Sequence, residues 1–149
     1  MRSLILLLFV GNCFFGCGVA SPLAQFTKSS ILNTTSDALE LNVEFEISNT
    51  NDSPIQLKMY TYAVTVNGDT VYKGKCSAEL TVPRWSTATS SVPVVISKTE
   101  ILDPSNINWS LMGSLEYVSP NAFAEALRTS GFLETSTKVN AQGVCSFAN

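Results

Sequence analysis

The sequence of 149 residues contains no histidine. Ser-His-Asp and Cys-His nucleophiles, histidine general bases and His-ligated metals are therefore excluded. Charged residues are also scarce, at 14% of the chain, and nine Lys and Arg against twelve Asp and Glu give a net charge of −3. This balance argues against a nucleic-acid-binding protein. Hydrophobic residues make up 45% of the chain, which excludes intrinsic disorder and fits one folded domain.

A long hydrophobic run is missing too. Leu4 to Val10 is an unbroken apolar stretch after Arg2, and the apolar character ends soon afterwards at Phe15. Because a bilayer requires about 20 apolar residues, this segment is too short to span one. A charged start, a short apolar middle and small residues at the end are typical of a secretory signal.

Two cleavage sites compete at the end of this signal. Phe14-Phe15-Gly16-Cys17 resembles the lipobox of bacterial lipoproteins, in which the cysteine becomes the lipid-bearing N-terminus. Gly18-Val19-Ala20 suits ordinary signal cleavage instead, which would release a soluble secreted or periplasmic chain starting at Ser21. We favour lipidation at Cys17, because the apolar run ends there and a polar segment follows.

The predicted organisation is a lipoprotein signal peptide over 1–16, a polar tether over 17–36 and a folded domain over 37–149. Gly18, and not Asp, follows the predicted lipidation site. By resemblance to the sorting of enterobacterial lipoproteins, this favours the periplasmic face of the outer membrane.

Beyond residue 37 the sequence predicts six or seven β-strands. Hydrophobic and polar residues alternate from Leu39 to Ile47, which is typical of a strand buried on one face. A change of parity near Met59-Tyr60 indicates a β-bulge in the next strand, and Asn67-Gly68 predicts a tight hairpin. The pattern favours a mainly β fold, an antiparallel immunoglobulin- or fibronectin-like β-sandwich with one short helix near 120–130. The remaining strands are expected over 71–82, 89–97, 107–117 and 133–147.

Several of these segments carry a family resemblance. The first strand ends in Asn49-Thr50-Asn51, the second leads into Asn67-Gly68, and a later strand places Gly113 between apolar residues. Together they resemble the water stress and hypersensitive response (WHy) domain of type-2 late embryogenesis abundant (LEA) proteins, although Thr50 stands where the family usually has proline. The resemblance implies a β-sandwich, an association with desiccation or osmotic stress, and neither catalytic residues nor a cofactor.

Cys76 and Cys145 are in phase with the apolar residues of their strands, so both are expected to face the core. In an oxidising compartment such a pair can form a disulfide. The two can equally remain separate buried thiols, because a shared phase does not bring two Cα atoms within bridging distance. The sequence leaves both alternatives open.

Other polar and aromatic residues have structural interpretations. Asn49 and Asn51 are expected to hydrogen-bond the backbone of their turn and not a ligand. Trp85 lies in a Pro-Arg-Trp-Ser turn. An exposed indole there would suit a partner, but we expect the ring to fold back over the open end of the sandwich. Cross-strand packing is expected for Tyr60, Tyr62 and Tyr72.

The acidic residues distinguish an enzyme from a binding module. A hydrolase that uses carboxylates alone needs two acids converging in a cleft, whereas these acids are scattered over strand faces and turns. Glu40, Glu44 and Glu46 share one strand face, which predicts solvation and no metal site. We therefore predict a non-enzymatic, membrane-tethered module that protects or binds under stress.

The alternative is an accessory lipoprotein that docks on an envelope protein complex through a strand edge. The remaining and least favoured hypothesis is an enzyme that depends on carboxylates. The predicted partners are the membrane, through the N-terminal lipid, and in the alternative case envelope proteins. No nucleic acid is expected, and the sequence does not predict the oligomeric state.

Overall fold

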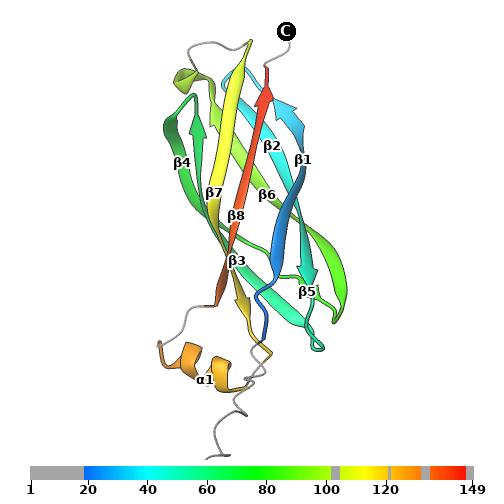
Figure 1. Cartoon of the computed structure of the whole chain (residues 1–149). Helices are drawn as coiled ribbons and strands as arrows, with labels where there is room; N and C mark the ends of the chain where they lie inside the picture. Colours follow the sequence, from blue (N-terminus) through cyan, green and yellow to red (C-terminus); the bar gives the residue numbers. More distant parts are fainter. Residues whose placement is uncertain (1–18, 102–104, 121, 132–134, 147–149) are drawn as a thin grey trace, which may run out of the picture.

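The structure, a computed structural model, describes residues 19–101, 105–120, 122–131 and 135–146. No helix in these ranges is long and apolar enough to cross a membrane. Figure 1 shows strands that run along the length of the molecule, with the helix beyond one end of them. The elements are β1 (Leu23–Thr34), β2 (Ala38–Asn49), β3 (Ile55–Val66), β4 (Asp69–Ser77), β5 (Thr81–Val82), β6 (Ser86–Ser97), the 3-10 helix η1 (Lys98–Glu100), β7 (Ile107–Val118), α1 (Ala122–Thr129) and β8 (Ser136–Cys145).

The strands form two antiparallel sheets. One has the order β1-β2-β6, and the other has the order β4-β3-β7-β8, with the short β5 paired to β3. Alternate residues of both sheets are buried between them, which is the arrangement of a β-sandwich. The predicted fold class, mainly β with one short helix, is therefore confirmed.

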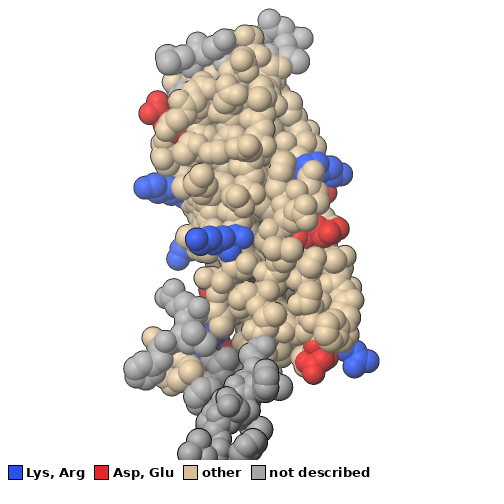
Figure 2. Space-filling model, viewed as in Figure 1, with Lys and Arg blue, Asp and Glu red and all other residues tan. Residues whose placement is uncertain are grey.

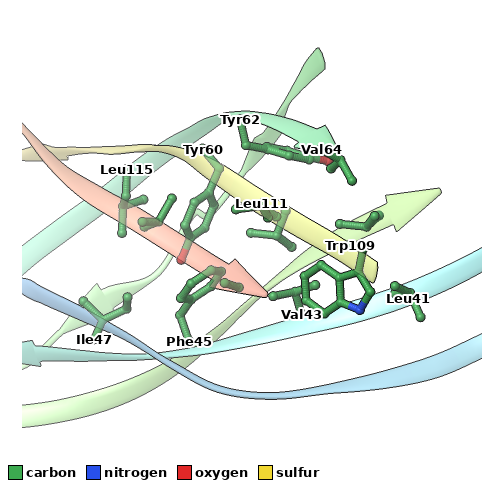
Figure 3. Packing of buried hydrophobic residues seen from close by; sticks show 14 of the residues in the cluster. Leu41, Val43, Phe45, Ile47, Tyr60, Tyr62, Val64, Trp109, Leu111 and Leu115 are labelled. Atoms are coloured by element: carbon green, nitrogen blue, oxygen red, sulfur yellow. The ribbon is translucent and has the colours of Figure 1, made fainter. Parts of the chain in front are cut away.

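The core follows from the alternation read in β2. Leu39, Leu41, Val43, Phe45 and Ile47 are all 2% exposed or less, and the polar residues between them face outward or lie half-buried. Figure 3 shows how the labelled side chains of the two sheets meet between the ribbons. Burial of such side chains contributes about 1.5–3 kcal/mol each, so this layer is the main source of stability.

Phe45 lies at the centre of the aromatic packing. Its ring stacks on that of Tyr60 at a centroid distance of 6.1 Å, and Phe26 meets both Phe45 and Trp109 edge to face at 6.3 Å. These contacts join β1 and β2 of one sheet to β3 and β7 of the other.

The irregularities predicted in β3 are also present. The pairing of β3 with β7 shifts between Leu57 and Met59, so Lys58 is the extra residue of a bulge. As a result, the two parities of β3 face one core: Leu57 and Tyr60 are both fully buried. Asn67-Gly68 forms the two-residue hairpin to β4, with φ of 51° and 98°.

The helix and the strand expected over 71–82 differ in detail from the prediction. α1 begins at Ala122, two residues after the expected start, and ends at Thr129. Beyond its end, Gly131 has a φ of 74° and its N–H donates to the Arg128 carbonyl, which closes the last turn. The single strand expected over 71–82 is divided into β4 and β5. Glu79 has a φ of 35° between them, a left-handed conformation that interrupts the strand.

The largest correction concerns the predicted tether over 17–36. Residues 23–34 of this segment form β1, which pairs with β2 along its whole length as an edge strand. The outer half of β1, residues 29–34, is exposed on both faces, so it shows none of the alternation that marks a strand in sequence. The folded domain therefore begins before residue 37. Residues 17 and 18 lie outside the described residues.

Candidate functional site

The most connected polar group of the described domain is the side chain of Asn49, the last residue of β2. It is 2% exposed. Its Nδ2 donates to the carbonyl oxygens of Ser53 at 2.9 Å, Pro83 at 3.1 Å and Val82 at 3.2 Å. Its Oδ1 accepts from the backbone N–H and the Nδ2 of Asn51, at 3.0 and 2.9 Å. One buried amide thus holds the turn after β2 against the turn before β6.

Asn51 extends this network to the N-terminal segment. Its Nδ2 donates to the Ala20 carbonyl at 2.9 Å, and its Oδ1 accepts from the Ala20 N–H at 2.8 Å. Its own carbonyl accepts from the N–H of Trp85 at 3.2 Å. We call the side chains of Asn49 and Asn51 with these backbone partners the amide clamp. The turn role expected for both asparagines is therefore present, and it is wider than the sequence indicated.

The clamp fastens the point at which the chain enters the sandwich. Next to Ala20, the Tyr117 hydroxyl contacts the Ser21 hydroxyl at 2.9 Å, and Pro22 is buried. β1 begins directly afterwards at Leu23, opposite Ser48 near the end of β2. Cys17, the predicted lipidation site, lies outside the described residues, three positions before Ala20.

Trp85 is placed differently from our expectation. Its side chain is 69% exposed, and its backbone has a φ of 52°. The expectation that the indole folds back over the end of the sandwich is wrong. The indole is instead open to solvent, on a turn residue whose backbone is left-handed.

Cys76 and Cys145 are both free and half-buried. The register of the sheet explains why they do not pair. Cys76 pairs with Tyr60, Tyr60 with Leu115, and Leu115 with Thr137, which lies eight residues before Cys145 on β8. Eight residues of strand extend about 27 Å, whereas a disulfide requires Cα atoms within about 7 Å. The disulfide alternative is therefore wrong, and burial raises the pKa of both thiols.

The tyrosines have packing roles, as expected. Tyr60 is fully buried against Phe45, and burial raises the pKa of its hydroxyl. Tyr62 donates to the Pro93 carbonyl of the opposite sheet at 2.7 Å, and burial raises the pKa of this hydroxyl as well. Tyr72 lies beside Tyr62 at a centroid distance of 5.7 Å.

Among the described acidic side chains, Glu116 and Glu125 both contact Arg128, at 3.8 and 2.7 Å, so the acids that approach each other there are paired with a cation. No group of three metal-ligating side chains occurs among the described residues. Glu44 faces Lys28 of β1 at 3.5 Å, and Glu125 forms two hydrogen bonds with Arg128 on α1, at 2.7 and 2.8 Å, which hold the pKa of the Glu125 carboxyl below its usual range. Figure 2 shows a largely uncharged face on which acidic and basic groups are scattered.

One shallow depression of about 490 Å³ lies on the outer face of the larger sheet. Lys73 and Lys75 of β4 border it on one side, and Met112 of β7 borders it on the other. All three side chains are exposed, and the depression contains no acid among its lining residues. It lacks the paired acids that carboxylate catalysis requires.

Solved structures share this fold at low sequence identity. A solution structure from Arabidopsis thaliana is 14% identical, with 87% of this chain and 84% of that chain covered and a TM-score of 0.64. The solution structure of a protein assigned to the late embryogenesis abundant proteins is 15% identical, covers 87% of this chain and 72% of that one, and has a TM-score of 0.67. A crystal structure from Archaeoglobus fulgidus is 14% identical, with 89% and 99% covered and a TM-score of 0.53.

No curated protein matches the chain. The model of the family described as late embryogenesis abundant protein matches residues 44–131, which is more than half of the 149 residues. This match runs from β2 to the end of α1 and includes Asn49 and Asn51 of the amide clamp. The family suggests a stress-associated, non-enzymatic protein. The chain belongs to the late embryogenesis abundant protein family.

Proposed function

We propose that the chain is a lipid-anchored, non-enzymatic module of the WHy type. It is held by a lipid on Cys17 at the periplasmic face of the outer membrane and protects or binds other components under desiccation or osmotic stress. The observation that carries the proposal is the pairing of the Asn51 side chain with the backbone of Ala20.

This pairing favours lipidation over the competing cleavage. Cleavage before Ser21 would remove Ala20, whose carbonyl accepts a hydrogen bond from the Nδ2 of Asn51 and whose N–H donates to its Oδ1. Asn51 is only 9% exposed, and an unsatisfied buried amide costs about 1–3 kcal/mol. Cleavage before Cys17 keeps Ala20 and the whole clamp.

The same pairing defines the length of the tether. Ala20 lies three positions after Cys17, and three extended residues reach at most about 11 Å. A lipid on Cys17 would therefore hold the clamp end of the sandwich close to the bilayer. Three acyl chains on one residue give essentially permanent attachment, since each buried CH₂ contributes about 0.8 kcal/mol.

Metabolic labelling with a fatty-acid analogue tests the anchor. The wild-type protein is expected to carry the label and Cys17→Ser to lack it. Cys13→Ser is the matched control: it changes a nearby cysteine of the signal and is expected to leave labelling unchanged. A labelled Cys17→Ser protein, or a mature chain that starts at Ser21, would contradict the proposal.

One observation favours the accessory role as a second candidate. β1 is an edge strand, and Ile31 and Leu32 in its outer half are 49% and 62% exposed. An unpaired edge with apolar side chains can accept a strand from another protein. A tagged wild-type chain would then capture an envelope protein from detergent-solubilised membranes, and Ile31→Lys with Leu32→Lys would lose it. Equal capture by both chains would contradict docking at this edge.

A further inference from the structure

Trp85 is the most exposed large apolar side chain among the described residues, at 69%. Its position is fixed by the backbone. The residue has a φ of 52°, its N–H donates to the Asn51 carbonyl, and the next residue, Ser86, pairs with Asn49 at the start of β6. The indole is thus presented to solvent from a turn that is tied down on both sides.

The same asparagine holds the N-terminal entry of the chain. Asn51 contacts Trp85 through its backbone carbonyl and Ala20 through its side-chain amide. Because both are hydrogen-bonded to Asn51, Trp85 and the start of the domain at Ala20 lie close together. If Cys17 carries a lipid, only a short chain segment separates the bilayer surface from Ala20, so the Trp85 turn also lies close to the bilayer.

A second exposed apolar side chain lies at this end. Leu23, the first residue of β1, is 63% exposed. It pairs with Ser48, and Ser48 pairs with Thr87, two residues after Trp85. Both apolar side chains therefore lie at the end of the smaller sheet where the chain enters.

The charges beside the indole are balanced. Arg84 precedes Trp85 and is exposed, and Asp52 follows Asn51 and is exposed as well. No net charge of these turns opposes contact with a lipid surface.

Tryptophan prefers the boundary between headgroups and acyl chains, because its ring is apolar and its N–H is a hydrogen-bond donor. We propose that Trp85 rests in the headgroup region of the bilayer that holds the lipid on Cys17, and that this second contact fixes the orientation of the sandwich. The inference depends on the lipid anchor proposed above. The expected occupant of this surface is the lipid bilayer itself and not a protein partner.

Tryptophan fluorescence can test this directly, because the chain has only two tryptophans and Trp109 is 2% exposed. The full-length lipidated protein is purified and reconstituted into phosphatidylcholine vesicles with or without bromine on the acyl carbons nearest the headgroup. The wild-type protein is expected to lose the Trp85 share of its emission in brominated vesicles. Trp85→Phe, which retains only the buried Trp109, is expected to lose almost none.

The matched control moves the exposed indole to another place. Met112 on β7 is 68% exposed, almost the same as Trp85. It lies five residues before Tyr117, whose hydroxyl contacts Ser21 at the entry of the chain, so it is about 17 Å further along the strand. Met112→Trp in the Trp85→Phe background is expected to show no loss of emission in brominated vesicles.

The outcomes separate this inference from the proposed function. Mass spectrometry of the same preparation determines whether Cys17 carries lipid, and a chain without lipid would overturn the anchor and with it the orientation. A lipidated protein whose Trp85 emission is unchanged by bromine would overturn the orientation alone. Equal quenching at positions 85 and 112 would also overturn it, since the sandwich would then lie on the membrane without a defined end.

Discussion

The side chain of Asn51 pairs with the backbone of Ala20 in the way that a neighbouring strand would, donating at 2.9 Å and accepting at 2.8 Å across 31 positions of sequence. Asn49 holds this amide in place by accepting from its Nδ2 at 2.9 Å. Side chains therefore hold the chain at Ala20, three residues before β1 begins at Leu23.

Removing the Asn51 amide should loosen this end of the domain. Asn51→Ala loses both bonds to Ala20 and leaves the Asn49 oxygen with one donor fewer, so we expect a free energy of unfolding about 1–3 kcal/mol lower, measured by urea denaturation. Protease cleavage near residue 20 of the native protein should become faster. The control is Asn42→Ala, whose amide makes one long bond of 3.4 Å to Glu44.

The control variant is expected to change the free energy of unfolding by less than about 0.5 kcal/mol. Equal effects of the two substitutions would mean that the clamp adds nothing beyond the loss of an ordinary asparagine.

The elements that could be predicted from sequence are those with local causes. The alternation of hydrophobic and polar residues in β2 predicts which side chains are buried, since every second residue from Leu39 to Ile47 lies in the core. The Asn67-Gly68 hairpin is determined by two residues that tolerate positive φ. The bulge in β3 was readable because the change of parity occurs within one strand.

The features that were missed have distant causes. β1 has no alternation in its outer half, and it is a strand because β2 pairs with it. The contact of Ala20 with Asn51 joins segments that no local pattern relates. Trp85 has a left-handed backbone, which a tryptophan gives no reason to expect, and its indole is exposed. The separation of Cys76 and Cys145 depends on the strand order and register.

The buried thiols predict a loss of stability in alkali. Burial raises the pKa of Cys76 and Cys145 above the ordinary value of 9.0, so the unfolded chain releases these protons first. Their contribution is complete below about pH 9 and is lost as the pH rises through the folded pKa. The free energy of unfolding, measured by urea titration in reductant, should therefore fall above this pH.

The double variant Cys76→Ala, Cys145→Ala should show a smaller fall just above pH 9, before the buried tyrosines add theirs. The same slope in both proteins would contradict the assignment to the thiols. Unfolding without reductant should leave both cysteines of the wild type open to alkylation, and a linked Cys76–Cys145 peptide would contradict the sheet register.

Gly113 is expected to tolerate no side chain. A Cβ at this position of β7 would meet the Thr61 carbonyl and would lie 2.8 Å from the Tyr62 Cα, so the paired strand would have to move. Gly113→Ala should lower the free energy of unfolding by about 1–3 kcal/mol, measured by thermal and urea denaturation. The adjacent Ser114→Ala, which adds no atoms, is the control, and a Gly113→Ala protein as stable as this control would contradict the close approach.

The proposed non-enzymatic role predicts that surface carboxylates can be replaced without loss of function. Glu44, Asp69 and Glu116 lie on different strands, and the Glu116 contact with Arg128 at 3.8 Å is exposed to solvent, which screens such pairs. The test uses a strain in which deletion of this gene impairs survival on drying or osmotic upshift. Each of three single variants should restore survival in that strain: Glu44→Gln, Asp69→Asn and Glu116→Gln.

Phe45→Ala provides the contrast, because it removes a fully buried ring that stacks on Tyr60. It should lower the free energy of unfolding by about 3–5 kcal/mol and fail to restore survival, since little folded sandwich would remain. Melting temperatures of the purified proteins distinguish a variant that fails because it unfolds from a variant that stays folded and still fails. A carboxylate variant that keeps its melting temperature and still fails to restore survival would show that a specific acidic site exists, and the non-enzymatic proposal would then be wrong.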